Sequence, residues 1–525
     1  MKKSLGAFIA PVLLCLAGSA MAQDGPAAVN VDALIKPLRG ALAGPVAAPP
    51  GAPASYVSFL ASQQAFDYRH LPDGAKARSQ AAFEEMQHYF HNVYDGLQVS
   101  KVVTIRGEDF DCIPITQQPS LRGKTLVAPA LPTGLLGRSA RAGSVVVATA
   151  PAQICGNGTI PFQRIRLDRL VQYPTLHDAL EAESHRGHPV SAVAALPAAP
   201  VAGTTADPTC PAPGYSTTEP DGAVHQWVET SYPATAMDGV TVTLSNWAPA
   251  IHPPLSTMSI AQSWLMAKND CSQTQTLETG IQVQPSWGTL KPVLFVFTTA
   301  GDYKDSTAKY NTSPGSMFVQ LANDVALGQA LPSSTMSVAG GTQQDTMFTW
   351  LRYNDATQGD NWYLLIDNKV IGYYPASGYP HGGLSKARPT AAFSVGGEVL
   401  SNPTIASDDV LLNLFGCYSR SSCAPQMGSG YPASYGYSYA AYAKGINYLL
   451  VDSKGSSVSP FAYSNDQAKV AYSDPKNASN GFVYGYQAAS SLPFNALTNR
   501  YGFPLGEESY NNGAAFFFGG DGYTQ

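Results

Sequence analysis

The strongest constraint on the fold is the pattern that fills residues 223–525. Short segments of β-branched and aromatic residues alternate there with turns rich in Gly, Asn, Asp and Ser, and helical periodicity is scarce. The clearest example is a hairpin in which Asp367 and Asn368 separate strand-like runs at 362–366 and 369–374. No repeat of fixed period emerges, which disfavours propellers and solenoids. We therefore expect these residues to form one antiparallel β-sandwich of two sheets.

The segment before this pattern has a different character. Phe83, Met86, Phe90 and Val93 recur at helical spacing and predict an amphipathic helix within 75–95. Runs of β-branched residues that follow, between 102 and 135 and again at 144–149, predict strands. Residues 23–185 are thus expected to form a small α+β domain. Pro, Ala and Thr dominate residues 186–222, which predicts an extended linker between the two domains.

The first 22 residues have the form of a secretory signal peptide. Lys2 and Lys3 precede an apolar run, and Ala20-Met21-Ala22 provides a small-residue cleavage site. The apolar run is too short to span a bilayer comfortably. We expect a mature chain that begins at Gln23 and is secreted, to the cell exterior or the periplasm, without a membrane partner.

Cysteine usage agrees with an oxidising compartment. Of seven cysteines, Cys15 lies in the expected signal peptide. The other six are Cys112, Cys155, Cys210, Cys271, Cys417 and Cys423. Their even number allows three disulfides, and we expect the pairs Cys112–Cys155 and Cys417–Cys423. No CxxC pair occurs and no His lies at ligand spacing, so no metal site is expected.

Charge and motif searches exclude several function classes. Only 13% of the residues are charged and the net charge is −6, which argues against a nucleic-acid partner. The sequence has no G-x-S-x-G elbow, H-E-x-x-H helix, P-loop or G-x-G-x-x-G fingerprint. No cofactor is expected, and the common serine hydrolase and metalloprotease classes are unsupported.

Two predicted strands, at 277–283 and 392–399, each carry a glutamate on their less apolar face. Because side chains alternate along a strand, Glu278 and Gln282 lie opposite the apolar residues of the first strand, and Glu398 does so on the second. A glycine lies close to each glutamate, and strand glycines often mark a place where another backbone approaches. Taken alone, such glutamates are most often solvated sheet residues.

Short motifs in several parts of the chain occur in the same order as the motifs of one protein family. They are 107–112 with Gln118-Pro119, 155–161, 259–264, 277–280, 361–362 with 371–376, 396–399, 426–430 and 518–522. In this order the sequence resembles the neprosin family of glutamic endopeptidases across nearly the whole mature chain. It departs from the plant members at Ile281, where they have an aromatic residue, and residues 453–512 match poorly.

The resemblance implies that Glu278 and Glu398 are the catalytic pair. Two carboxylates held close cannot both ionise cheaply, so we expect them to share a proton and to supply an acid and a base at low pH. The ionised glutamate would take a proton from a water that attacks the scissile carbonyl. The protonated glutamate would polarise the carbonyl oxygen or protonate the leaving nitrogen.

The resemblance further implies a zymogen whose substrates are proteins or peptides cleaved after proline. Residues 23–185 would be an activation pro-domain that acts as an intramolecular inhibitor, and the linker would be the site of self-cleavage at low pH. Gln282 is a candidate donor to the oxyanion, although an ordinary strand Gln is as good an interpretation. Candidate walls of a proline pocket are Trp264, Trp287, Trp362 and Tyr374.

Two alternatives stay open from the sequence. A β-sandwich with exposed Trp and Tyr also suits a secreted carbohydrate-binding module without catalysis. A surface adhesin or structural β-protein would give Glu278 and Glu398 no special role.

Overall fold

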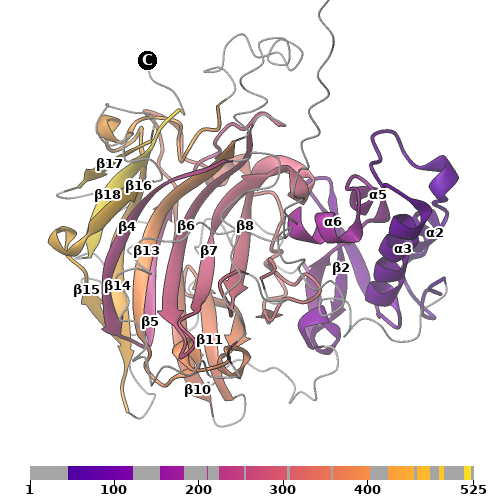
Figure 1. The fold of residues 1–525 in the computed structure, drawn as a ribbon, viewed down its shortest axis with the longest axis horizontal. Coiled ribbons are helices and arrows are strands. Elements are labelled where there is room, and N and C mark those ends of the chain that lie inside the picture. Colours follow the sequence, from indigo (N-terminus) through magenta and orange to yellow (C-terminus); the bar gives the residue numbers. More distant parts are fainter. Residues whose placement is uncertain are drawn as a thin grey trace, which may run out of the picture.

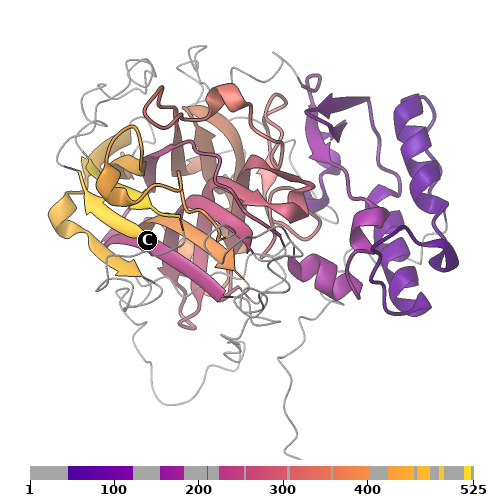
Figure 2. The ribbon, with the colours of Figure 1, turned by 90° about the horizontal axis from the view of Figure 1, so that it is seen from above.

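The computed structural model describes residues 45–121, 154–182, 210, 224–253, 256–303, 308–355, 359–401, 424–453, 458–472, 484–489 and 513–521. Within these ranges the protein is mainly β, with three antiparallel sheets and few helices. Residues 45–121 and 154–182, hereafter the N-terminal part, lie at one side of a larger β-rich part (Figures 1 and 2). The expected signal peptide, the strand at 144–149 and almost all of the linker lie outside the described residues.

The N-terminal part packs helices against a small sheet. Its helices are α2 (Ala54–Gln64), α3 (Gln80–Tyr94), α5 (Leu167–Leu170) and α6 (Leu176–Ala182). Its sheet has the order β1-β2-β3, formed by β1 (Lys101–Ile105), β2 (Glu108–Pro114) and β3 (Thr159–Gln163).

The amphipathic helix expected within 75–95 is α3. It begins after Ser79, whose Oγ accepts a hydrogen bond from the Ala82 amide at 3.1 Å, a typical N-cap. It ends before Gly96, whose φ of 67° is left-handed. The predicted apolar stripe of Phe83 and its helical neighbours is buried in the core of this part.

One sheet of the β-rich part has six strands in the order β16-β4-β13-β6-β7-β8. These are β16 (Lys469–Tyr472), β4 (Val224–Ala236), β13 (Thr390–Ser401), β6 (Ser256–Lys268), β7 (Thr274–Gln284) and β8 (Thr289–Thr299). All the pairings in this sheet are antiparallel.

The other sheet has nine strands in the order β17-β18-β14-β5-β10-β11-β12-β9, with β15 paired to β14. Its first five strands in chain order are β5 (Gly239–Ser245), β9 (Val319–Gln320), β10 (Asp345–Asp355), β11 (Gly359–Ile366) and β12 (Lys369–Pro375). The others are β14 (Ala441–Val451), β15 (Val458–Ala462), β17 (Gly485–Ala488) and β18 (Ala514–Gly519). The hairpin predicted at Asp367-Asn368 joins β11 to β12, and both turn residues have the positive φ that a two-residue turn needs.

The two sheets pack face to face around one core. Leu277 and Val395 of the six-stranded sheet lie in the same buried cluster as Trp350 and Leu364 of the nine-stranded sheet. Figure 1 shows β4, β13, β6, β7 and β8 as one curved layer with β10 and β11 behind it. The expected antiparallel two-sheet sandwich is therefore confirmed.

The N-terminal part contacts the side of the sandwich where β8 and β9 are the edge strands. Arg106 Nη1 donates to the Ala330 carbonyl at 2.6 Å. Gln118 exchanges two hydrogen bonds with the backbone of Gln320 on β9, at 2.9 and 2.8 Å. The Gln118 bonds thus cover β9, an edge of the nine-stranded sheet, whereas the Arg106 bond lies beside β8 through the bridge between Ala330 and Val293.

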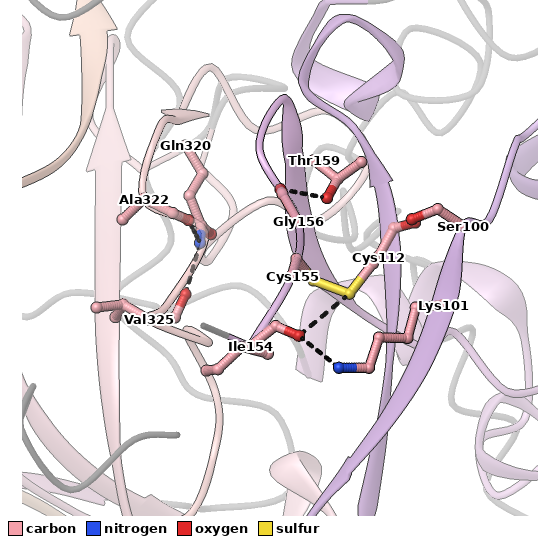
Figure 3. The surroundings of a disulfide bond; sticks show 10 residues. All are labelled: Ser100, Lys101, Cys112, Ile154, Cys155, Gly156, Thr159, Gln320, Ala322 and Val325. Carbon is pink, nitrogen blue, oxygen red and sulfur yellow. Dashed lines mark hydrogen bonds between the residues drawn. A yellow bond between two sulfur atoms is a disulfide. The ribbon is translucent and has the colours of Figure 1, made fainter. Parts of the chain in front are cut away.

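The expected disulfide Cys112–Cys155 is present at this junction, with its Cα atoms 5.5 Å apart. Figure 3 shows it between β2 and the loop that precedes β3, close to Gln320 and Val325 of the sandwich. The Cys155 amide donates to the Asn323 carbonyl at 2.8 Å, so the bridge stiffens a segment that itself binds the sandwich.

A second disulfide, Cys210–Cys271, was not among the pairs expected from the sequence. It fastens one residue of the linker region to the turn between β6 and β7, at a sequence separation of 61. The other expected pair, Cys417–Cys423, lies outside the described residues. No helix in the described ranges is long and apolar enough to cross a membrane.

Candidate active site

Glu278 and Glu398 lie on one face of the six-stranded sheet, on the two strands that flank β6. Glu278 of β7 pairs in register with Trp264, and Glu398 of β13 pairs with Ile260. Trp264 and Ile260 are four residues apart on β6, so both point to the same face and their partners lie on a diagonal. The offset along β6 is roughly 13 Å in an ideal strand. We call this outer surface of the sheet the carboxylate face.

The alternation predicted for both strands is observed. Leu277 and Ile281 of β7, and Val395 of β13, point into the core between the sheets. The glutamates therefore occupy the opposite face, as expected from the sequence.

The carboxylate face is not solvated, in contrast to ordinary sheet glutamates. Glu278 and Glu398 are both 0% exposed. The chain that follows β8 folds back over the sheet, where the ring of Tyr310 lies 4.9 Å from that of Phe297. The Asn311 amide fixes this segment by donating to the Val296 carbonyl at 2.9 Å. The aromatic cover explains why a face with several polar residues excludes water.

Glu278 receives two hydrogen bonds at one oxygen. Its Oε1 accepts from Thr276 Oγ1 at 2.7 Å and from the Tyr303 hydroxyl at 2.8 Å. Tyr303 and Asp302 have φ values of 63° and 54°, a left-handed conformation that is costly for a bulky residue. Thr299 Oγ1 holds this turn by accepting from the Tyr303 amide at 2.8 Å. The strained turn directs a partly exposed Tyr303 to Glu278.

Both carboxylates influence the tyrosines above them. Burial raises the pKa of the Tyr303 hydroxyl well above its usual value, and the charge and hydrogen bond of Glu278 and the charge of Glu398 raise this pKa further. Burial also raises the pKa of Tyr310, again with contributions from both glutamates. These hydroxyls therefore stay protonated and remain hydrogen-bond donors beside the pair.

Glu398 is contacted at both of its oxygens. Its Oε1 contacts His225 Nδ1, and its Oε2 accepts from Gln262 Nε2 at 3.3 Å. Gln262 lies in register between Gly280 of β7 and Gly396 of β13. With no side chain at either glycine, the Gln262 side chain lies between the two glutamates.

Gln282, the candidate oxyanion donor, lies on the carboxylate face in register with Ile260. Its Nε2 donates to Gln284 Oε1 at 2.7 Å and to the Tyr310 hydroxyl at 3.1 Å. Its Oε1 accepts from Trp287 Nε1 at 3.0 Å. In this arrangement Gln282 links Trp287 and Tyr310.

The four candidate pocket aromatics are divided between two regions. Trp264 lies in register with Glu278, and Trp287 contacts Gln282, so both belong to the carboxylate face. Trp362 and Tyr374 instead lie in the core between the sheets. The structure does not bring these two aromatics to the glutamates, because β11 and β12 belong to the nine-stranded sheet.

Several residues of the face were not singled out from the sequence. They are His225, Glu229, Gln262, Thr276, Tyr303 and Tyr310. Gln262 alone had a usable signal, because it lies in the motif 259–264 two residues from Trp264. Tyr303 follows a strand in a turn, and His225 is far from Glu398 in sequence, so periodicity could not relate either to the pair.

A cavity of about 320 Å³ separates the N-terminal part from this end of the sandwich. Arg164, Arg169 and Tyr173 line one side, and Trp287 and Tyr310 line the other. Nearby, Lys309 Nζ donates to the Leu180 carbonyl of α6 at 2.7 Å, and Figure 1 shows α6 beside β8. The N-terminal part thus reaches the aromatic residues that border the carboxylate face.

Fold and site together define a β-sandwich protein with a buried, carboxylate-rich face. The family model described as Neprosin matches residues 256–487, which include Glu278, Gln262, Tyr303 and Glu398. These residues therefore form a Neprosin domain, and the neprosin family is peptidase-related. Among solved structures, an alginate lyase mutant in complex with alginate tetrasaccharide is 9% identical, with a TM-score of 0.17, over 33% of this chain and 73% of that one.

Proposed function

We propose that the protein is the secreted zymogen of a glutamic endopeptidase, in which Glu278 and Glu398 activate a water to hydrolyse peptide bonds at acidic pH. The observation that carries this proposal is the position of both carboxylates on one buried face, flanking Gln262. The Gln262 side chain lies between them and would contact a water or a peptide carbonyl bound at the pair.

The reaction needs one protonated and one ionised glutamate. The ionised carboxylate removes a proton from water as the water oxygen attacks the carbonyl carbon. The protonated carboxyl hydrogen-bonds to the carbonyl oxygen and then gives its proton to the leaving nitrogen as the C–N bond breaks. The two glutamates have then exchanged states, and transfer of one proton back restores the pair.

Hydrogen-bond donors and apolar walls on the same face suit a peptide substrate. Tyr303 and Gln282 provide donors for the negative charge that develops on the carbonyl oxygen. Trp264 and Trp287 provide rigid apolar surface of the kind that binds a proline ring, and this supports a preference for cleavage after proline.

The N-terminal part is proposed to act as the intramolecular inhibitor. Its contacts through Arg106 and Leu180 place it beside the aromatic border of the site, where it obstructs access along the face. Cleavage in the segment 186–222 would release it. Because Cys210 is bonded to Cys271, cleavage before residue 210 separates the two parts, whereas cleavage after residue 210 leaves the N-terminal part attached to the sandwich through this disulfide. Disulfides of this kind agree with secretion.

Digestion of casein and of proline-containing peptides by the acid-treated full-length protein tests the proposal. Activity is expected below pH 5 and is expected to vanish in both Glu278→Ala and Glu398→Ala. Full-length protein held at pH 3–4 should lose its N-terminal part, whereas Glu278→Gln should remain one band. Retained activity in either alanine variant would refute the glutamate pair, and sugar binding without hydrolysis would favour the carbohydrate-binding module.

A further inference from the structure

We propose that His225 is a positioning residue which, as an imidazolium, keeps Glu398 ionised in acid, so that Glu398 is the base of the pair and Glu278 the acid. This inference rests on the proposed peptidase function and assigns the roles within its site. The contact between His225 and Glu398 was not predicted from the sequence.

His225 reaches Glu398 across two antiparallel strands. On β4, Trp227 pairs with Glu398 and His225 pairs with Leu400, so His225 points to the carboxylate face one step further along the sheet. The His225 side chain is 9% exposed and that of Glu398 is 0% exposed. An ion pair formed here is poorly screened by water and by salt, so it acts strongly on the proton affinity of both groups.

The hydrogen bonds of the two glutamates also favour an ionised Glu398 and a neutral Glu278. Glu398 is contacted by His225 at Oε1 and by Gln262 at Oε2, the pattern of a carboxylate that accepts through both oxygens. Glu278 receives the Thr276 and Tyr303 donors at Oε1. Two donors fill the two lone pairs of a carbonyl oxygen, which assigns the proton of a neutral Glu278 to Oε2.

The charges around His225 favour a single ionised carboxylate. Besides Glu398, the same face carries Glu278 on β7 and Glu229, which is buried on β4 opposite Gly396. Tyr303 and Tyr310 above the pair are neutral, and Lys469 of β16, opposite Ser231, is exposed. Several buried anions repel one another, so one imidazolium best supports one carboxylate, the one that it touches.

The ordinary proton affinities of imidazole and carboxylate determine which of the two groups holds a proton in acid. A free imidazole binds its proton near pH 6.5 and a free glutamate near pH 4.3. At pH 3–4 an isolated glutamate is largely protonated and makes a poor base, whereas histidine is fully charged. His225 keeps its proton throughout the reaction: water gives its proton to Glu398, Glu278 gives its own to the leaving nitrogen, and the pair is then reset.

The pH dependence of peptide hydrolysis by His225→Gln tests this role. Glutamine keeps a hydrogen-bonding group but not the charge. The acid limb of kcat/KM is expected to move up by at least about 1 pH unit, a loss of about tenfold at pH 3, with the basic limb unchanged. The exposed His252, in the same half of the chain, provides the matched control His252→Gln, which should keep the wild-type profile.

The outcomes separate this inference from the proposed function. If the wild-type protein digests no peptide, or digests equally well as Glu278→Gln, the peptidase function itself fails. If the wild type is active and Glu278→Gln is not, an unmoved acid limb in His225→Gln overturns the role of His225. A shift of the basic limb instead would make Glu398 the acid, and also overturns the assignment.

A measurement without the His225 variant covers the case in which that variant does not fold or process. In full-length Glu278→Gln, NMR titration of the nine histidine rings should show one resonance that titrates at higher pH than the rest. The additional change Glu398→Gln should lower its midpoint by at least about 1 unit. A spectrum in which no histidine responds to Glu398→Gln would refute the ion pair.

Discussion

Replacing Gly396 by alanine tests whether close contact between β4 and β13 holds Glu398 in place. A Cβ at position 396 would lie 2.0 Å from the Val228 carbonyl oxygen and 2.8 Å from Cα of Glu229. Carbon and oxygen atoms in contact ordinarily lie about 3.3–3.6 Å apart. The two strands would therefore have to separate by about 1 Å at a register position two residues before Glu398.

Gly397→Ala is the matched control, because the neighbouring Cβ meets a side chain instead of backbone. It would lie 2.6 Å from Cγ and 2.8 Å from Sδ of Met427, and 3.0 Å from a ring carbon of Phe518. Methionine has three rotatable bonds and moves aside at small cost. We expect a loss of about 1 kcal/mol in unfolding free energy for Gly397→Ala.

For Gly396→Ala we expect a larger loss. Separation of two paired strands leaves at least one buried backbone group without its partner, at about 1–3 kcal/mol, in addition to about 1–3 kcal/mol of overpacking. The sum is about 2–6 kcal/mol. Urea unfolding of both variants in a Glu278→Gln background, which prevents self-digestion, measures the difference. Equal losses, or a smaller loss for Gly396→Ala, would refute this account of the glycine.

Three further predictions concern other contacts. Changing Cys112 and Cys155 to alanine should cost the N-terminal part about 4 kcal/mol, since the bridge spans 43 residues, as measured by hydrogen exchange of α3 amides. Tyr303→Phe removes a donor to Glu278 and should lower kcat of peptide hydrolysis about 10- to 100-fold with KM nearly unchanged. Burial raises the pKa of Asp111 from 3.8 to about 6, so the folded N-terminal part holds a proton that the unfolded chain releases between these values. Its stability against urea should therefore rise, by on the order of 2 kcal/mol, as pH falls from 7 to 4.

Each of these predictions has its own control. Removing Cys210–Cys271 should leave α3 exchange unchanged, and equal exchange in both disulfide variants would contradict the first prediction. Tyr435→Phe, at an exposed ring, should keep wild-type kcat, and a KM effect in Tyr303→Phe without a kcat effect would contradict the second. Asp111→Asn should abolish the pH-dependent gain, and a gain that persists in this variant would assign it to another group.

The expected rise in stability when Asp111 takes up a proton bears on how the N-terminal part would be released in the proposed activation. At this carboxyl the effect of burial outweighs the opposing hydrogen bond and charge of Arg164, so protonation of Asp111 is expected to favour the folded state. In the proposed activation, release of the N-terminal part at low pH would therefore follow cleavage of the segment 186–222 and not protonation of Asp111.

Local geometry accounts for what could be predicted from the sequence. Period-two alternation assigned Glu278 and Glu398 to the faces opposite Leu277 and Val395, because side-chain direction along a strand depends only on the chain itself. The α3 stripe and the turn at Asp367-Asn368 follow from equally local rules.

Only the tertiary structure decided what those faces become. The strand order puts β6 between the glutamates and adds His225 from β4, and the pairings of β13 with β6 and with β4 join segments more than one hundred residues apart. The cover of Tyr303 and Tyr310 turns a nominally solvated face into a dry one, in which charges act strongly. Trp362 and Tyr374 lie away from the pair for the same reason. Cross-strand hydrogen bonds and burial between distant segments determine the neighbours of each residue, and the periodicity within one segment carries no information about those neighbours.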